Sequence, residues 1–531
     1  IPAIARAQEA NSLRAPAVPL IPVDPYFGIW SPGDRLTDTD TTHWTEAPNR
    51  LTSLIRIDGK TFRVMGKDPA DVPALEQKQL RIMPTTVTYT FEGAGVRLEL
   101  SFLTPLLPED LMVFSRPVTY LTWQVRSTDG SGHQVQVYYD NTAELVVHDP
   151  KVEKVTFAAE QVGEIGVLKV GSADQPVLRR KGDRVRINWG YQYVAVPPAQ
   201  DGKLLIAAPD AAREAWDGQV PAAPADAVVA AQAPVLSVTF NLGKVGQQPV
   251  SRWLVLAYDD IYSAQYFRTE LRAYWKKDGA QINDLLKQSV AEYSSLKTRC
   301  AQFDQELMAD LEKAGGARYA WICALAYRQS LAASKVVADG NGQPLFFCKE
   351  NTSNGCMGTV DVFYPQAPLP LLISPSLSKA MLVPVLEYAS TSAWTWPNAP
   401  HDVGTWPQAN GQVYGGTKSN GGHAGGGNRQ HAAAGGGGGA NGRQRGFCGQ
   451  VLAGSDDLGQ VPGAIRTRSG EPTLHGRFRG SSGAQRQPSR KGDLCAGRLW
   501  QTGSHAWRPS GRRQISQDGP RVRPGLDQAS R

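Results

Sequence analysis

The chain has 531 residues, of which 41% are hydrophobic, so it is long enough for two or more domains with buried cores. Its formal charge of +7 invites a nucleic-acid partner, but residues 416–531 hold 18 Lys and Arg against 6 Asp and Glu, whereas residues 1–415 carry a net charge of −5. The basic excess therefore lies in the last part of the chain, which also holds 27 of the 54 glycines, and we expect no nucleic-acid partner.

Apolar runs, the first twelve residues and the cysteines bear on location and cofactors. No run of about 18 apolar residues is present, so we expect no transmembrane segment. Residues 1–12, IPAIARAQEANS, contain a small-x-small pattern at Ala5–Ala7 that is typical of a leader cleavage site, although a plain disordered N-terminus fits these residues equally well. We expect a leader remnant and a secreted or periplasmic location. The six cysteines lack CxxC spacing, and we expect no metal and no cofactor.

The first half of the chain has the pattern of a β-sandwich. Residues 13–83 begin with a proline-rich stretch that favours extended chain and continue into SLIRIDGKTFRVMG, a predicted hairpin around Asp58-Gly59. TVTYTFEGAGVRLELSF predicts a second hairpin, and YLTWQVRSTDGSGHQVQVYYD repeats the pattern with a turn at Asp129-Gly130. Further strands are expected in KVTFAAEQ, VLSVTFNLG and RWLVLAYDD, so residues 84–260 are the predicted sandwich domain.

The hydrophobic period then changes from two to between three and four. SAQYFRTELRAYWKKDG, residues 263–279, predicts one helix that ends at Gly279. Residues 280–314 predict an amphipathic helix, or two in series, closed by Gly315-Gly316. RYAWICALAYRQSLAASKVVADG predicts a more apolar helix, and residues 261–416 are therefore the predicted helical domain.

A dense polar cluster follows the apolar helix, in FFCKENTSNGCMGTVDVFYP. Gly and Asn residues indicate a loop, and loops on a rigid scaffold commonly carry catalytic groups, although such residues also cap helices and satisfy turns. The candidate catalytic residues here are Glu350 and Asp361. The candidate substrate-binding residues are Lys349, Asn351, Asn354 and Tyr364.

A second cluster, WTWPNAPHDVGTWPQANGQ, combines aromatic faces with a His-Asp pair. Trp394, Trp396 and Trp406 are candidates for lining a pocket for a sugar or small amide. His401 and Asp402 are candidates for proton transfer, although a single histidine is more often structural. Asp259 and Asp260 lie where a strand gives way to the predicted helix, and helix capping is their expected role in preference to a site.

Four stretches together resemble the glutaminase A family over residues 13–416. They are VPLIPVDPYFGIWSPGDRLTDTDTTHWT, LAYDDIYSAQYF, LFFCKENTSNGCMGTVDVFYPQAPL and APHDVGTWPQANGQVYGG. The resemblance implies a β-sandwich followed by an (α/α)6-type toroid like that of six-hairpin glycosidases. It also implies hydrolysis of L-glutamine to glutamate and ammonia. It assigns no catalytic residue, so the candidate residues depend on the two clusters alone.

The last part of the chain departs from the family, whose members continue with a segment like MPVEESGNMLLL. Read one nucleotide later, the codons of residues 420–434 permit MEDMPVEETGNMLLL, and those of residues 473–488 permit LCTDDFAGHLAHNANL, which is similar to a later family motif. We therefore interpret residues 417–531 as an out-of-frame, disordered tail in preference to a natural low-complexity segment.

The sequence thus predicts a multidomain β and α protein: a leader remnant at 1–12, an extended and hairpin segment at 13–83, a sandwich at 84–260, and an incomplete toroid at 261–416. The expected function is that of a glutaminase-family hydrolase, inactive because its helical ring is incomplete. The alternatives are a six-hairpin glycoside hydrolase and a non-catalytic carbohydrate-binding protein. The expected partner is a small molecule, glutamine or a sugar.

Overall fold

A computed structural model describes residues 13–218, 228–232, 234–414, 464–466 and 472–474 of the chain. The leader remnant lies outside these residues, as do two of the cysteines. Of the predicted tail, the structure describes only an antiparallel pair, β24 (Ala464–Arg466) and β25 (Pro472–Leu474). The disorder of residues 417–531 and the domain boundaries stay predictions.

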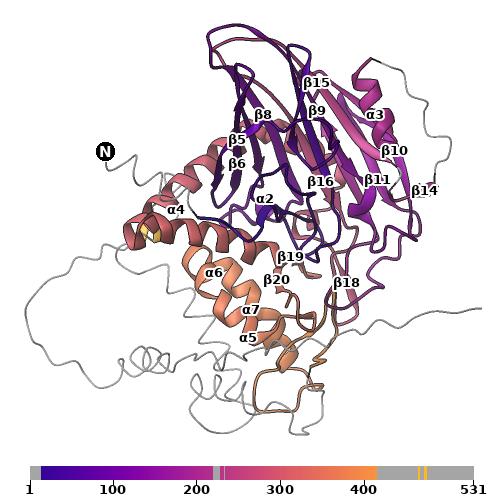
Figure 1. The fold of residues 1–531 in the computed structure, drawn as a ribbon. Helices are drawn as coiled ribbons and strands as arrows, with labels where there is room; N and C mark the ends of the chain where they lie inside the picture. Colours follow the sequence, from indigo (N-terminus) through magenta and orange to yellow (C-terminus); the bar gives the residue numbers. More distant parts are fainter. Residues whose placement is uncertain (1–12, 219–227, 233, 415–463, 467–471, 475–531) are drawn as a thin grey trace, which may run out of the picture. The chain divides into compact units, whose positions relative to one another are not determined.

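Two antiparallel sheets pack face to face and form the predicted β-sandwich (Figure 1). The larger sheet runs in the order β14 (Val228–Ala230), β10 (Lys154–Val162), β11 (Ile165–Ser172), β12 (Tyr191–Val196), β16 (Val250–Asp259), β8 (Val118–Ser127), β7 (Val96–Leu103), β6 (Thr86–Gly93) and β5 (Glu76–Ile82). The smaller sheet runs in the order β13 (Gly202–Ala207), β15 (Val235–Val245), β9 (His133–Thr142), β3 (Leu51–Ile57) and β4 (Lys60–Met65).

The core of the sandwich forms where alternate side chains of both sheets meet. Trp123 on β8 is fully buried, and its ring lies 5.8 Å from Tyr139 on β9 and 5.9 Å from Phe240 on β15. Its indole N–H donates to Ser53 Oγ on β3 at 3.0 Å. One aromatic side chain therefore contacts three strands of the opposite sheet, and its polar atom is satisfied inside the core.

The predicted hairpins are confirmed where a two-residue turn sets the register. β3 and β4 are joined by Asp58 and Gly59, both with positive φ, and β6 and β7 by Ala94 and Gly95 in the same conformation. The third predicted pair is different. β8 and β9 flank Asp129-Gly130, but they lie in different sheets, so this connection crosses the sandwich. The reason is that the loop of five residues, Thr128–Gly132, is long enough to change layer.

The helix predicted for residues 263–279 is wrong. The segment forms β17 (Ala264–Tyr266), β18 (Thr269–Leu271) and a 3-10 turn, η3 (Tyr274–Lys276). Phe267 and Arg268 adopt positive φ values of 46° and 65°, which an α-helix cannot contain. β17 instead pairs in parallel with β23 (Gln408–Ala409), so tertiary pairing outweighs the helical period of this stretch.

The next two predicted helices form α4 (Ile282–Ala332), which kinks at Gly316, where φ is 84° and ψ is 175°. The predicted break at Gly315-Gly316 is therefore confirmed. The second half ends at Ala332, before the end expected from the sequence, because SKVVA forms β19 (Ser334–Ala338) and pairs with β20 (Pro344–Cys348).

Polar contacts hold α4 against the strands. Arg328 is fully buried, and its guanidinium donates to the carbonyls of Pro19, Leu20 and Pro84 at 2.8 to 3.2 Å. Asp304 accepts from Thr85 N and Oγ1, both at 2.8 Å. These contacts join the helix to the hairpin of β1 (Val18–Pro22) and β2 (Gly28–Ser31) and to the start of β6.

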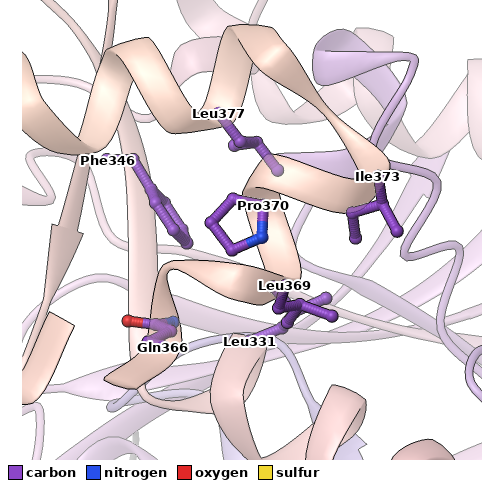
Figure 2. A pocket seen from close by; sticks show the side chains of 7 residues that line it. All are labelled: Leu331, Phe346, Gln366, Leu369, Pro370, Ile373 and Leu377. Carbon is purple, nitrogen blue, oxygen red and sulfur yellow. The ribbon is translucent and has the colours of Figure 1, made fainter. Parts of the chain in front are cut away.

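Three helices follow: α5 (Val360–Gln366), α6 (Pro368–Ile373) and α7 (Pro375–Ala389). Ser374 caps α7 by accepting from Leu377 N, and Pro375 stands at the first helical position. Side chains of these helices, of the end of α4 and of β20 surround a shallow apolar recess with no room for a water molecule (Figure 2); it is lined by Leu331, Phe346, Gln366, Leu369, Pro370, Ile373 and Leu377.

The remaining short elements are α2 (Leu111–Phe114), α3 (Pro209–Trp216), η1 (Ala143–Val146), η2 (Pro198–Gln200), β21 (Cys356–Met357) and β22 (Gly404–Thr405). Among the described residues, no helix is long and apolar enough to cross a membrane. The prediction of a β-sandwich followed by helices is confirmed, whereas the toroid itself stays a prediction.

Candidate functional site

The two polar clusters predicted from the sequence come together in one place. β21, in the first cluster, pairs antiparallel with β22, in the second, so that Cys356 faces Thr405 and Met357 faces Gly404. The N–H of Val360 also donates to the carbonyl of His401 at 2.9 Å. Backbone pairing between segments about fifty residues apart therefore builds the site.

Asp402 is the fixed point of this site, because it is fully buried and completely hydrogen-bonded. Its Oδ1 accepts from the backbone N–H groups of Gly404 and Val413 at 2.9 and 3.0 Å. Its Oδ2 accepts from Tyr414 N at 3.1 Å and lies 3.0 Å from His401 Nδ1. Three backbone donors stabilise the charged carboxylate, and the carboxylate in turn orients the imidazole.

His401 places its second nitrogen toward the two acidic residues of the first cluster. Nε2 lies 3.9 Å from Asp361 Oδ1, and His401, Asp361 and Glu350 each offer one atom within 4.8 Å of the others. Cys356 forms a second group of this kind with His401 and Asp402. All four predicted catalytic residues therefore lie in one cluster, with Asp402 beneath and Asp361 at the surface.

Charge explains the titration of this cluster. The hydrogen bond to Asp402 raises the pKa of His401 against the effect of burial, and the charges of Asp402, Asp361 and Glu350 raise it further. Burial raises the pKa of Cys356 to about 12, with Asp402 contributing, so the thiol stays protonated. The imidazole of His401 therefore keeps its second proton to a higher pH than a free histidine does.

Lys349 lies under the loop that carries Glu350. Its amine is 3.2 Å from Asp183 Oδ1 and 3.1 Å from the carbonyl of Glu350, and it stands 4.6 Å from the centre of the Trp44 ring. Burial lowers the pKa of Lys349 to about 8, and Asp183 opposes that effect. The side chain is fully buried, so it anchors the loop from below.

The asparagines of the first cluster shape the loop. Asn354 Oδ1 accepts from Cys356 N at 2.9 Å, which is an Asx turn. Asn351 Oδ1 and Glu350 Oε2 are buried and have no hydrogen-bond partner among the described residues. Gly355 has a φ of 74°, and a Cβ there would lie 2.4 Å from the backbone of Gly182, so only glycine lets this loop approach so closely.

The aromatic candidates are distributed differently from the carboxylates. Tyr364, on α5, is 54% exposed, and Trp396 is partly buried. Trp394 is buried, and its N–H donates to Asn398 O at 2.6 Å. Trp406 is completely buried, with its ring 5.3 Å from that of Tyr26, so it presents no face to a ligand in this structure. Binding of a ligand by Tyr364, Trp394 and Trp396 stays a prediction.

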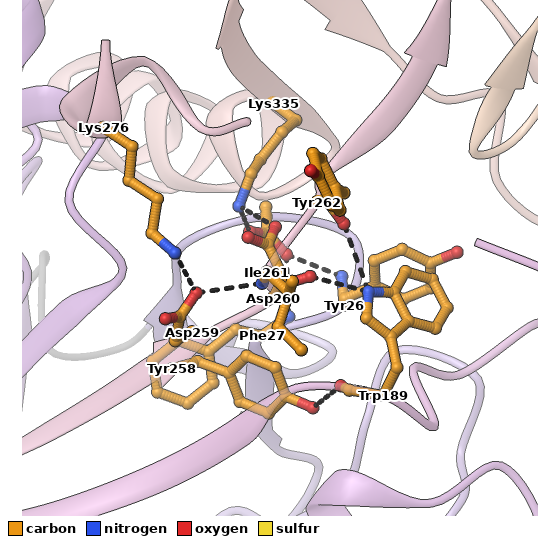
Figure 3. A network of polar contacts seen from close by, with 11 residues as sticks. Tyr26, Phe27, Trp189, Tyr258, Asp259, Asp260, Ile261, Tyr262, Lys276 and Lys335 are labelled. Carbon is orange, nitrogen blue, oxygen red and sulfur yellow. Dashed lines mark hydrogen bonds and ion pairs between the residues drawn. The ribbon is translucent and has the colours of Figure 1, made fainter. Parts of the chain in front are cut away.

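Asp259 and Asp260 do not cap a helix, because the expected helix does not form. Asp259 pairs with Lys276 and accepts from Ile261 N at 2.9 Å (Figure 3). Asp260 Oδ2 lies 2.9 Å from the amine of Lys335, whose other partner is Asp24 Oδ2 at 2.6 Å. Both aspartates therefore belong to a buried ion-pair network.

Two aromatic side chains extend this network (Figure 3). The Trp189 indole N–H donates to the carbonyls of Asp260 and Tyr262 at 2.7 and 3.1 Å, and the Tyr258 hydroxyl donates to the carbonyl of Trp189 at 2.6 Å. Burial raises the pKa of Tyr258 far above its ordinary value, so the hydroxyl stays a donor. The network thus joins the end of β16 to β12, β19 and the β1–β2 turn.

Sequence reasoning missed several residues around the site. Asp183, which accepts from Thr352 N at 2.8 Å and pairs with Lys349, comes from an ordinary charged stretch with no local signal. Trp44 lies within one of the four family-like stretches, and that position was the available clue. Cys356 was set aside because it lacks a neighbouring cysteine, although it lies within the first polar cluster.

Comparisons with known proteins find family models and relatives that match parts of this chain. The model of the glutaminase A six helical-hairpin domain matches residues 316–421, and two models described as domains of unknown function match residues 3–76 and 85–310. The chain is 29% identical to Glutaminase A of Aspergillus oryzae over 432 residues, which are 77% of this chain and 61% of that protein. It is 22% identical to a probable glutaminase of Arthroderma benhamiae, over 76% of this chain and 51% of that protein.

These matches define the class as a hydrolase family in which a β-rich region precedes helical hairpins. More particularly, the matches support the glutaminase A family, through the six helical-hairpin model and the first of these relatives. It spans 61% and 51% of the lengths of these two relatives. A putative kojibiose phosphorylase from human microbiome is similar at a TM-score of 0.36 and 10% identity, over 72% of this chain and 44% of that one, which is too low to support an argument.

Proposed function

We propose that the intact form of this protein hydrolyses the side-chain amide of L-glutamine to glutamate and ammonia. The observation that carries the proposal is the convergence of Glu350, Asp361 and His401 over the buried Asp402. The names of the two curated relatives support the substrate. The cluster supplies both of the groups that amide hydrolysis needs, a base for water and an acid for the leaving nitrogen.

We propose the following roles, which the positions of these side chains support. Asp361, exposed beside His401 Nε2, takes a proton from water as the water oxygen bonds to the amide carbon. His401, held at Nδ1 by Asp402, donates a proton to the amide nitrogen as the carbon–nitrogen bond breaks and ammonia leaves. Lys349 supports the loop from below, because its buried amine binds Asp183 and the carbonyl of Glu350.

We also propose that α4, α5, α6 and α7 are the first part of an (α/α)6 toroid that this chain does not complete. Five large apolar side chains on these helices are 47 to 59% exposed: Tyr319, Ile322, Tyr364, Leu371 and Leu372. Such a concentration of exposed apolar side chains marks a face that packs against something. The match to the six helical-hairpin model ends at residue 421, close to residue 416, after which we infer a shifted reading frame, and this supports the inference of an inactive product.

The decisive comparison uses two genes, one as given and one with a single base restored near codon 416. Ammonia release from glutamine is measured for both, beside hydrolysis of a panel of aryl glycosides. We expect glutaminase activity in the restored protein and at least a hundredfold less in the chain as given. Equal activity in both would contradict the proposal of an incomplete domain, and turnover of neither substrate class by the restored protein would contradict the proposed reaction.

Variants of the restored protein then test the roles. Asp361→Asn and His401→Gln are expected to lower kcat by a factor of about 10² to 10⁴, whereas Asp174→Asn, at an exposed carboxylate between β11 and β12, is the matched control. Retention of full activity by Asp361→Asn would remove that residue from the mechanism.

A glycoside hydrolase is the second candidate, because the oxygens of Glu350 and Asp361 lie within 4.8 Å of each other. Retaining glycosidases place two carboxyl groups about 5 to 5.5 Å apart, and inverting enzymes place them about 6.5 to 9.5 Å apart. The observed separation favours the retaining type if the substrate is a sugar. The aryl glycoside panel distinguishes this reaction from amide hydrolysis. We propose an exported location for either enzyme, which cell fractionation tests.

A further inference from the structure

The tautomer of His401 leaves one nitrogen lone pair facing two carboxylates. Nδ1 lies 3.0 Å from Asp402 Oδ2, and a carboxylate held by three backbone N–H donors can only accept, so Nδ1 carries the proton. In the neutral ring the lone pair is then on Nε2. That atom faces Asp361 at 3.9 Å, with Glu350 in the same group of atoms within 4.8 Å.

The gap between His401 Nε2 and Asp361 Oδ1 is too wide for a hydrogen bond. A separation of 3.9 Å exceeds the donor–acceptor range of about 2.7 to 3.2 Å. Two atoms bound to one Zn²⁺ at about 2.1 Å each lie about 3.4 to 4.2 Å apart, depending on the angle between them. The distance from Nε2 to Asp361 Oδ1 therefore lies within the range open to two ligands of one cation, at a ligand–metal–ligand angle wider than tetrahedral.

Glu350 gives an independent indication that a charged partner belongs here. Its Oε2 is buried and has no hydrogen-bond partner among the described residues. A buried oxygen of this kind costs free energy unless a cation, a proton or water satisfies it. The nearby cation, Lys349, bonds the carbonyl of Glu350 and the carboxylate of Asp183 instead.

We propose that Glu350, Asp361 and His401 form a binding site for one divalent transition-metal cation, with Zn²⁺ as the representative ion. One imidazole and two carboxylates supply three ligands of the type Zn²⁺ accepts and leave a position open, as in catalytic rather than structural sites. Asp402 is the positioning residue, because a carboxylate on the far nitrogen fixes the ring and strengthens its donor atom.

This inference goes beyond the proposed function and does not depend on the substrate. The lone pair of Nε2 cannot hold a cation and deliver a proton at the same time. The metal content of the protein therefore decides whether His401 acts as an acid or as a ligand. The proposal departs from the sequence-based prediction of no metal, which was drawn from the spacing of the cysteines.

The experiment measures Zn²⁺ binding directly, on the full chain as given, because all four residues precede residue 415. The protein is treated with EDTA, dialysed and titrated with ZnCl₂ by calorimetry, and the bound metal is counted by mass spectrometry. We expect the parent protein to bind one Zn²⁺ per chain. His401→Ala and Asp361→Asn should lose this ion, and the control Asp174→Asn should retain it. Asp402→Asn is expected to weaken binding by about 10- to 100-fold.

A second readout guards against variants that fail to fold. Co²⁺ in place of Zn²⁺ is expected to give visible absorption bands that disappear in Asp361→Asn, while the far-ultraviolet circular dichroism of that variant stays unchanged. Zinc bound equally by the parent and by His401→Ala would overturn the proposal, and so would the absence of any stoichiometric binding by the folded parent. Neither result depends on glutaminase activity, so the proposed reaction is tested separately, whereas the role of His401 as an acid is decided by the metal content.

Discussion

Replacing Lys335 by methionine tests the buried ion-pair network most directly. The amine lies 2.6 Å from Asp24 and 2.9 Å from Asp260, and all three side chains are less than 10% exposed. At an effective dielectric constant of about 20, each contact has a gross attraction of about 6 kcal/mol. Desolvation of the three ions offsets much of this, and removal of one partner from a buried pair costs about 3–5 kcal/mol.

The free energy of unfolding that Lys335→Met loses should depend on pH, and the pKa shifts give the direction. Burial opposes the charge on Lys335, but the two aspartates outweigh it and raise its pKa; the pKa of Asp260 is lowered, because Lys335 outweighs the effect of burial. The raised lysine contributes stability that is lost only at strongly alkaline pH, and the lowered aspartate contributes stability that is lost only as pH falls below about 4. In Lys335→Met the two buried carboxylates repel each other, so protonation relieves the variant as pH falls.

Urea unfolding, followed by tryptophan fluorescence, measures this effect. We take the free energy of unfolding to fall by about 2 kcal/mol per molar urea. Lys335→Met should then lower the midpoint of the first unfolding transition by about 1.5 to 2.5 M at pH 8, and by clearly less at pH 5. The control is Lys154→Met, at an exposed position on β10. Adding Asp260→Asn should recover at least about 1 kcal/mol. A midpoint for Lys335→Met that equals the control at both pH values would refute this account of the network.

Three further predictions use the same unfolding assay or a simple variation of it. Burial lowers the pKa of His43 to about 3, so the unfolded chain binds a proton at this residue below pH 6.5 and the folded chain does not. The free energy of unfolding should therefore fall by about 1.4 kcal/mol per pH unit between pH 6 and 4. His43→Gln should flatten this slope, and an unchanged slope would mean that other groups cause it. Gly190→Ala should cost about 3 kcal/mol or more, since its Cβ would lie 2.1 Å from a carbonyl oxygen of the next strand, whereas Gly59→Ala, at a similar φ with no atom within 4 Å, should cost about 1 kcal/mol; equal costs would contradict the steric argument. Ile322→Lys combined with Leu372→Lys should reduce binding of a hydrophobic dye and light scattering without lowering the urea midpoint, because both side chains are more than half exposed; a lowered midpoint would mean that they pack in solution.

The sequence predicts the sandwich well because its strands carry local signals. Asp58-Gly59 and Ala94-Gly95 specify tight turns, and the alternation on both sides of each turn identifies the buried face. The helix predicted for residues 263–279 was wrong, because the apolar residues of this segment repeat at helical spacing. The strand with which it pairs, β23, is about 140 residues away. Nothing local in such a segment distinguishes a helix face from a short strand that pairs with a distant loop.

The candidate site was predicted in part for a related reason. Glu350, Asp361, His401 and Asp402 stood out because polar groups in Gly- and Asn-rich loops are unusual between apolar segments. Their meeting depends on the pairing of β21 with β22, two strands of two residues each, which are too short to leave a periodic pattern. Asp183 and the network around Lys335 were missed because their significance lies in tertiary contacts between segments far apart in the chain.

The long sequence separation of the contacts to the N-terminal hairpin has a consequence for synthesis on the ribosome. Asp24 finds its partner 311 residues later, and Pro19 accepts from a side chain 309 residues later. At about 5–20 residues per second, roughly 15 to 60 seconds pass between the emergence of the two members of each pair. The first strands to be synthesised are thus among the last to form their tertiary contacts. The nascent chain exposes their apolar side chains to chaperones throughout that interval.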